Sequence, residues 1–355
     1  MKSTTKKLFS LLLIVALLGA FLVSCTAPED KTTEKGTERT TVPDSVSSET
    51  ESDAPLTPDT GLPIRIAVLT GSTGYGAVKL MDDASGGKAG MNYQITKEDN
   101  AKIIQDSLLA GEVDIAALPT NKASMIYNAT DKAIQVIAVN TLGVLSLVTT
   151  NGETITGISD LRGKTVCVPE EPSYILRALC EKAGLVDGTD VTIETYATPS
   201  QLLAAVIKGQ VAYAVLPEPL LSTAMSKKDT IRISLNLSDE WAKVFDGASL
   251  MQGCLVVRTA WAKEHPAELA RFLSDYEASI RFVNENVTEA SALIETYFGT
   301  AAAVAKNAIL HCNLVYIAGT EMAEKLGEFY RHIQNMPGVN MGNALPGTDF
   351  YYTAE

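Results

Sequence analysis

The chain has 355 residues, of which 46% are hydrophobic, and its 29 basic and 42 acidic side chains give a net charge of −13. Nucleic-acid binding requires clustered Lys and Arg to neutralise phosphates, so this acidic balance argues against a nucleic-acid partner. The only histidines are His265, His311 and His332, without helical metal-ligand spacing, and there is no CxxC pair. We therefore expect no metal site and no cofactor.

The first residues have the pattern of an export signal. Lys2, Lys6 and Lys7 precede an apolar run at 8–23, which is shorter than the roughly 20 residues of a spanning helix and typical of a signal peptide. The run ends in Leu-Val-Ser-Cys, which resembles the bacterial lipobox, whose Cys is lipidated and becomes the new N-terminus. We predict a lipoprotein signal peptide at 1–24 and lipidation of Cys25. An uncleaved anchor is the alternative, and both interpretations place the protein on the outer face of the cell membrane.

Residues 25–61 form a different kind of segment. Large apolar side chains are almost absent and acidic residues are frequent, so the segment cannot bury enough surface to offset its ordering entropy. We predict a disordered, lipid-anchored tether.

From residue 62, short apolar runs alternate with helical patterns, which favours an α/β fold. A first set of elements is predicted as strands at 64–69, 92–96, 113–118, 134–140 and 144–149 and helices at 75–82, 100–110 and 121–129. A second set is predicted as strands at 165–168, 191–196, 211–216 and 231–235 and helices at 174–183, 200–208 and 220–226.

The two sets repeat one segment. LAGEVDIAALP at 109–119 matches IKGQVAYAVLP at 207–217, with Gly ending a helix, an apolar run forming a buried strand and Pro starting the next loop. We predict two similar lobes, each a mainly parallel sheet flanked by helices.

The last predicted strand lies at 251–258, and everything after it is predicted to be helical, at 266–283, 288–297, 301–310 and 320–333. These C-terminal helices are expected to pack on the first lobe. The chain would then cross between the lobes twice, near 145–150 and 247–254, which makes a hinge. The predicted domains are 62–148 with 253–355 for lobe 1, and 149–252 for lobe 2.

Candidate binding residues follow the strands, because ligands of open α/β sheets lie beyond the carboxyl ends of the strands. The loop after the first strand offers backbone N–H groups and hydroxyls at Ser72, Thr73, Gly74 and Tyr75. It is not a GxGxxG dinucleotide motif, and a tight turn that requires glycines is the alternative. The other candidates are Thr120, Asn121, Asn140 and Thr141 in lobe 1, Glu170, Tyr174 and Glu218 in lobe 2, and Gln252 at the hinge. For each carboxylate, a solvated loop residue or a helix cap is the alternative.

No catalytic arrangement is visible, since the chain has no GxSxG motif and no His paired by sequence with a nucleophile. We expect no enzyme activity. Cys167, Cys180, Cys254 and Cys312 lie in apolar contexts and are expected to be buried free thiols. One bridge, such as Cys167 with Cys180, stays open because an extracytoplasmic compartment can be oxidising.

Several stretches resemble the substrate-binding lipoproteins of ABC importers, in the group that handles nitrate, sulfonates, taurine and thiamine precursors. They are GSTGYGAVKLM at 71–81, GEVDIAALP at 111–119, ISDLRGKTVCV at 158–168, GQVAYAVLPEP at 209–219 and QGCLVVR at 252–258. The resemblance covers 62–355 and implies the type II periplasmic-binding-protein fold. It also implies a monomer that traps a small solute between two lobes and passes it to a membrane permease driven by an ATPase.

Two ligand classes compete. The loop at 72–74 favours an anion such as a sulfonate or nitrate, held by backbone N–H groups. Glu170, Glu218, Tyr75 and Tyr174 favour an amino-bearing aromatic ring such as a thiamine pyrimidine precursor. We favour the ring, since desolvating a small anion beside two carboxylates is costly. The rival classes are an enzyme on the same two-lobed fold, of the pyrimidine synthase or dehydratase type, and an extracellular sensor or adhesin. The Cys-rich motif of the synthase is missing here, and the dehydratase type acts inside the cell.

Overall fold

The structure is a computed structural model that describes residues 57–342 and 344–353. The predicted signal peptide at 1–24, Cys25 and most of the predicted tether lie outside the described residues. Within the described part, no helix combines the length and the apolar character needed to cross a bilayer.

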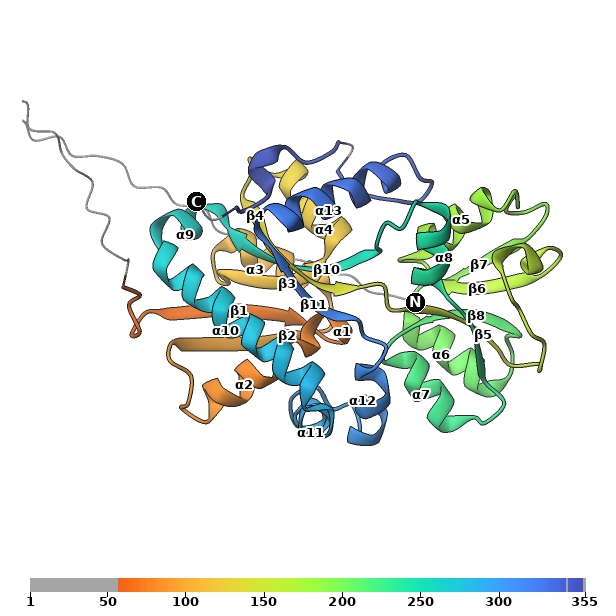
Figure 1. Cartoon of the computed structure of the whole chain (residues 1–355), viewed down its shortest axis with the longest axis horizontal. Coiled ribbons are helices and arrows are strands. Elements are labelled where there is room, and N and C mark those ends of the chain that lie inside the picture. The colour runs from red at the N-terminus through yellow and green to blue at the C-terminus, as the bar shows by residue number, and fades with distance from the viewer. Residues whose placement is uncertain (1–56, 343, 354–355) are drawn as a thin grey trace, which may run out of the picture. The chain divides into compact units, whose positions relative to one another are not determined.

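Sheet A combines early and late parts of the chain (Figure 1). Its strands are β1 (Pro63–Leu69), β2 (Asn92–Glu98), β3 (Ile115–Pro119), β4 (Ile134–Leu142), β10 (Met251–Arg258) and β11 (Leu314–Ala318). Their order in the sheet is β11-β4-β10-β3-β1-β2. Strand β1 is parallel to β2 and β3, with Ile66 opposite both Ile95 and Ile115, whereas β10 runs antiparallel to its neighbours β3 and β4.

Sheet B is built from one continuous part of the chain. Its strands are β5 (Leu145–Thr149), β6 (Thr165–Pro169), β7 (Thr192–Tyr196), β8 (Tyr213–Pro217) and β9 (Arg232–Asn236), in the order β7-β6-β8-β5-β9. Strand β6 is parallel to β7 and β8, and β5 is antiparallel to β8 and β9. The predicted α/β fold class, with two similar sheets, is confirmed. We call sheet A with its helices lobe 1, and sheet B with its helices lobe 2.

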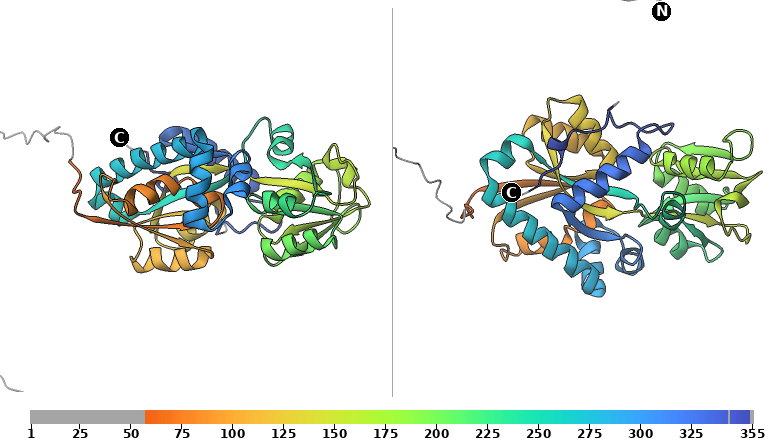
Figure 2. Two further views of the ribbon diagram at one scale, coloured as in Figure 1. Left: turned by 90° about the horizontal axis from the view of Figure 1, so that it is seen from below. Right: turned by 45° about the horizontal axis from the view of Figure 1, so that its top comes forward.

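Helices flank both sheets. Lobe 1 carries α1 (Ser72–Tyr75), α2 (Val78–Ser85), α3 (Ala101–Ala110), α4 (Thr120–Ala129), α9 (Thr259–Glu264), α10 (Pro266–Glu285), α11 (Val287–Phe298), α12 (Ala302–Ile309) and α13 (Gly319–Ile333). Lobe 2 carries α5 (Ser173–Lys182), α6 (Pro199–Lys208), α7 (Leu220–Lys227) and α8 (Leu237–Val244). As predicted, C-terminal helices pack on lobe 1: α10 and α11 contact α2, and α13 contacts β4 (Figure 2).

The sequence repeat corresponds to equivalent positions in the two sheets. Asn100 caps the start of α3 and Thr198 caps α6, each side chain accepting a hydrogen bond from a backbone N–H. Gly111 and Gly209 end these helices with φ of 73° and 72°, a left-handed conformation that favours glycine. The strands that follow, β3 and β8, are each parallel to one neighbour and antiparallel to the other.

Two predictions about the elements are wrong. The chain after 258 is not entirely helical, because β11 pairs antiparallel with the edge strand β4. The helix expected at 75–82 is divided into α1 and α2. Near the division lies Gly76, where an added Cβ would be 2.9 Å from Ile280 Cγ1 of α10.

The boundary between the lobes, expected at 148/149, lies earlier in the chain, since β5 (Leu145–Thr149) belongs to sheet B. The first crossing is at Gly143, where an added Cβ would meet Ser238 Oγ at 2.0 Å.

An aromatic seam joins the two lobes, formed by Trp241 and Phe245 with Phe329 and His332. Trp241 of α8 stacks on Phe245 with ring centroids 4.0 Å apart, and Phe329 of α13 lies 5.9 Å from Trp241. The His332 ring lies 4.8 Å from that of Phe245. One hydrophobic core therefore continues through these side chains from lobe 1 into lobe 2.

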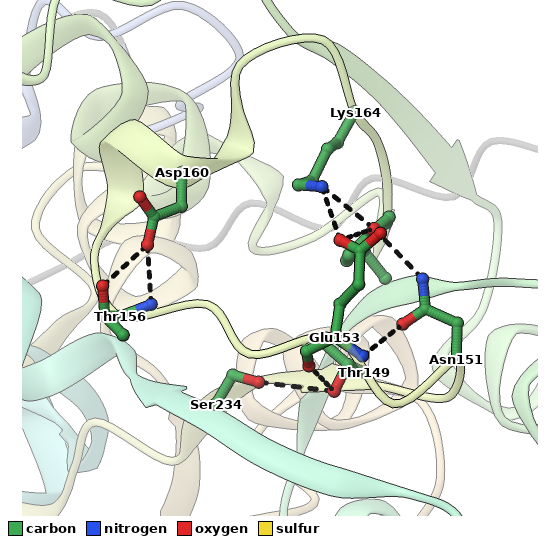
Figure 3. Close-up of polar contacts among 8 residues, drawn as sticks. Thr149, Asn151, Glu153, Thr156, Asp160, Lys164 and Ser234 are labelled. Carbon is green, nitrogen blue, oxygen red and sulfur yellow. Dashed lines mark hydrogen bonds and ion pairs between the residues drawn. The ribbon is translucent and has the colours of Figure 1, made fainter.

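A polar cluster holds the loop between β5 and β6 against sheet B (Figure 3). Lys164 Nζ lies 2.6 Å from Glu153 Oε2 and 3.1 Å from the Tyr213 hydroxyl, which also accepts from Asn151 Nδ2 at 3.1 Å. Thr156 donates to Asp160 Oδ2 at 2.8 Å. The polar side chains of the cluster serve as hydrogen-bond and ion-pair partners for one another, so the cluster holds the loop in place.

The four cysteines of the described residues, Cys167, Cys180, Cys254 and Cys312, are free and buried. The expectation of buried thiols is confirmed, and the alternative bridge between Cys167 and Cys180 is not formed.

Candidate functional site

A cavity of about 760 Å³ lies where carboxyl ends of parallel strands from both sheets meet. Leu69 ends β1 and Pro119 ends β3, while Glu170 follows β6 and Ala197 follows β7. We call this cavity the cleft. Its lining is completed by Asp99, Asn100, Ala101, Lys122, Glu171, Ser173, Arg177, Thr195, Pro199 and Gly338. Its position agrees with the general rule for ligand sites in open α/β sheets.

The charges of the cleft are only partly neutralised. Lys122 Nζ lies 3.1 Å from Glu171 Oε1, and Arg177 pairs with Asp187 outside the lining. Among the described residues, the carboxylates of Asp99 and Glu170 have no ion-pair partner, and both residues are exposed. The cleft therefore presents unpaired negative charge to an incoming solute.

Polar contacts connect the lobes at two places. At the cleft, Lys122 of α4 pairs with Glu171 of lobe 2, and Asn121 Nδ2 lies 3.5 Å from Glu171 Oε2. Elsewhere, the buried Ser72 hydroxyl donates to the backbone carbonyl of Glu218 at 2.9 Å. Ser72 and Asn121, both predicted from the sequence, thus contact the opposite lobe.

Several predicted residues form a buried network within and beside sheet A. Asn140 Nδ2 donates to the Thr73 carbonyl at 2.9 Å and to the Tyr276 hydroxyl at 3.0 Å. Thr141 donates to Asn140 Oδ1 at 3.1 Å, and Thr120 donates to the Met251 carbonyl at 2.6 Å. These polar groups already have protein partners, so they fix the short helix α1 and the start of β10.

The segment after β1, which the structure folds into the short helix α1, is closely packed. An added Cβ at Gly74 would lie 2.4 Å from the Leu69 carbonyl oxygen, so the need for glycine there is steric. Tyr75 is fully buried, with its hydroxyl 2.8 Å from Thr300 Oγ1 and its ring edge-on to Phe298. Burial raises its pKa. Tyr75 therefore offers no ring face to a solute, which removes it as a stacking candidate in this conformation.

The remaining predicted residues are separated in space. Glu170 lines the cleft, whereas Glu218 lines a second cavity that shares no lining residue with it. Tyr174 is 4% exposed, and burial raises its pKa. Gln252 Oε1 accepts from the Val144 N–H at 2.7 Å, which joins the two crossings between the lobes. Of the binding residues predicted from the sequence, the structure thus brings only Glu170 into the lining of the cleft.

Sequence reasoning missed Asp99, Lys122 and Arg177, which supply most of the charge of the cleft together with Glu170 and Glu171, the two carboxylates of the loop after β6. Asp99 directly follows β2, and Lys122 lies in the first turn of α4. The available signal was position alone: each is at, or within about one helical turn of, a loop after a parallel strand.

A family model described as NMT1/THI5 like matches residues 87–290, more than half of the chain. None of the curated proteins compared with the chain matches it.

Solved structures share the fold. A crystal structure of an ABC transporter from Parabacteroides distasonis is 22% identical, with a TM-score of 0.69, and the match covers 84% of this chain and 100% of that one. The periplasmic aliphatic sulphonate-binding protein of Escherichia coli is 16% identical, with a TM-score of 0.63 and coverage of 82% and 94%. The periplasmic nitrate-binding protein of Synechocystis is 13% identical, with a TM-score of 0.59 and coverage of 78% and 82%. At these identities the likeness shows a common fold.

Proposed function

The chain belongs to the NMT1/THI5-like family, and from this premise we propose that it is an extracytoplasmic solute-binding protein of an ABC importer. It traps a small organic solute between its lobes and delivers it to a membrane permease, without making or breaking a bond. The observation that carries this proposal is the cleft, which is lined by loops from the carboxyl ends of strands in both sheets. The fold shared with sulphonate- and nitrate-binding transport proteins supports it.

The charge of the cleft favours a solute with amino groups. Within the part of the chain that the structure describes, Glu170 and Asp99 have no ion-pair partner, while Lys122 and Arg177 are each neutralised by a carboxylate. A small anion would be repelled by the unpaired carboxylates, whereas an exocyclic amine could donate to Glu170. We propose an amino-bearing aromatic heterocycle, of the kind of a thiamine pyrimidine precursor.

Glu170→Gln is expected to weaken binding of an aminopyrimidine by about tenfold or more, because a charge-assisted hydrogen bond contributes about 1.5–3 kcal/mol. Calorimetric titration of the full chain with 4-amino-2-methyl-5-(hydroxymethyl)pyrimidine measures the change. Taurine and nitrate are titrated in parallel.

Glu181→Gln is the matched control, since Glu181 is exposed on α5 and does not line the cleft. It should leave the affinity unchanged. If the parent binds taurine or nitrate instead, and Glu170→Gln strengthens that binding, the solute is an anion. Equal aminopyrimidine affinity in the parent and Glu170→Gln would contradict the proposed ligand contact.

The proposed location depends on Cys25. Cys25→Ala is expected to move the protein out of the membrane fraction or to leave it as an unprocessed precursor, since the residue that would carry the lipid is gone. Membrane fractionation and the mass of the N-terminal peptide measure both results. Cys180→Ala, at a buried cysteine of the fold, should stay with the membranes. A Cys25→Ala protein that keeps the distribution of the parent and is still cleaved before position 25 would contradict the lipid anchor.

A further inference from the structure

A second pocket, of about 420 Å³, is formed jointly by the two lobes. Lobe 2 contributes Glu218 from the loop after β8, Met225 from α7 and Ile233 from β9. Lobe 1 contributes Asn307 from α12, with Leu310 and His311 directly after this helix. No lining residue is shared with the cleft, so the two cavities can be tested separately.

A buried carboxylate lies in this pocket without a counterion. Glu218 is 3% exposed, and within the described residues it forms no ion pair. Its two carboxylate oxygens each accept one hydrogen bond at 3.1 Å, from the backbone N–H and the hydroxyl of Ser222. Because a carboxylate oxygen has two acceptor positions, each oxygen can accept another donor.

The backbone at Glu218 is held from two sides. Its N–H donates to the Val144 carbonyl at 3.0 Å, and its carbonyl accepts from the Ser72 hydroxyl at 2.9 Å. Val144 lies at the crossing between the lobes and Ser72 lies in lobe 1. The carboxylate is therefore anchored at the junction of the two lobes.

The rest of the pocket is mixed. Ser222, Ser226, Asn307 and His311 are polar, and the apolar part consists of Met225, Ile233 and Leu310. Met225, Ile233 and Leu310 are 39%, 41% and 65% exposed, and they are three of the eight large hydrophobic side chains that are exposed in the described residues. These three side chains line the same pocket as the buried Glu218 carboxylate. A ligand with a charged end and an apolar body would fit both features.

We infer that this second pocket binds a small primary ammonium compound with an apolar body. The ammonium group donates to Glu218, and the body lies against Met225, Ile233 and Leu310. The ammonium supplies the counterion that a buried carboxylate lacks, and two of its three N–H donors match the two free acceptor positions. This site is separate from the solute cleft of the proposed function and does not depend on the identity of that solute.

The test is calorimetric titration of the full chain with 2-phenylethylammonium at pH 8, where Glu218, whose pKa burial raises to about 7, is ionised. Its neutral counterpart, 2-phenylethanol, is titrated alongside. We expect the parent to bind the ammonium about tenfold or more tightly than the alcohol. Glu218→Gln should remove most of this difference by weakening the ammonium alone.

Two further variants locate the ligand. Leu310→Ser, at a largely exposed position where folding is not at risk, should weaken both probes about threefold through lost apolar contact. Glu170→Gln changes the cleft and not this pocket, so it should leave both affinities as in the parent. A failure of the proposed solute to bind the cleft would not alter these results.

The inference is overturned if the parent binds neither probe at millimolar concentration, or binds the two equally. It is also overturned if Glu170→Gln rather than Glu218→Gln abolishes the preference for the ammonium, which would place the probe in the cleft. Should Glu218→Gln fail to fold, Leu310→Ser and Met225→Ser decide: weakened ammonium binding in both supports the site, and unchanged binding refutes it.

Discussion

Trp241→Ala is expected to lower the free energy of unfolding by about 3–5 kcal/mol, as for other large aromatic side chains removed from a core. Trp241 is fully buried, stacks on Phe245 and contacts Phe329 across the aromatic seam. Its Nε1 has no hydrogen-bond partner in the described residues. The loss is therefore one of packing, and it removes contacts that both lobes share.

Urea denaturation followed by fluorescence and circular dichroism measures this change. Trp241→Phe keeps an aromatic ring in the seam and should cost clearly less than Trp241→Ala. Val244→Ala, at a partly exposed position on the same helix, should change stability by about 0.5 kcal/mol or less. A Trp241→Ala protein as stable as the parent would show that the seam is not part of the folded core.

Asp114→Ala is expected to cost about 3 kcal/mol of stability, at the lower end for a broken buried ion pair. The Asp114 side chain is 1% exposed and accepts from Arg65 Nε at 2.9 Å and from an Arg258 guanidinium nitrogen at 2.8 Å. It thereby ties β1 to the end of β10, across β3. The arginines are 38% and 25% exposed, so water partly solvates them once the carboxylate is gone.

The pH dependence of stability provides the second measurement for Asp114. Burial opposes its ionisation, but the hydrogen bonds from Arg65 and Arg258 outweigh burial and lower its pKa below the ordinary value. Its contribution is therefore fully present above the unfolded-state pKa near 3.8 and is lost as the pH falls through the lower folded-state pKa. The parent should lose this contribution on acidification, and Asp114→Ala should lack it.

Asp106→Ala is the matched control for Asp114→Ala. Asp106 pairs with Lys102 on α3, and both side chains are largely exposed, so removing it should cost about 0.5 kcal/mol or less. Equal effects of the two substitutions would contradict the role given to Asp114.

The order of elements was predictable because local signals decide it. Gly111 and Gly209 end helices and precede buried apolar runs, and the repeat therefore identifies equivalent strands from the sequence alone. The strand β11 was missed because Leu314–Ala318 is short and lies between helices, so that only its pairing with β4 defines it.

The site was less predictable, since side-chain direction depends on tertiary contacts. Glu170 and Glu218 both follow buried strands, yet Glu170 lines the cleft while Glu218 turns back onto Ser222, four residues later. Tyr75 follows the first strand, where a binding residue is expected, but its side chain is enclosed by Phe298 and Thr300. These two residues lie more than 200 residues away in sequence. No local pattern contains that information.

The position of β10 in sheet A has a consequence for how the protein is made. Strand β10 lies between β3 and β4, and it is encoded after all of sheet B. Until Met251–Arg258 leaves the ribosome, β4 has no hydrogen-bonded path to β1, β2 and β3. Sheet B, by contrast, is complete once residue 236 is synthesised. The lobe that begins first in sequence is therefore finished last, and we expect its long-range pairing to be the slower step of folding.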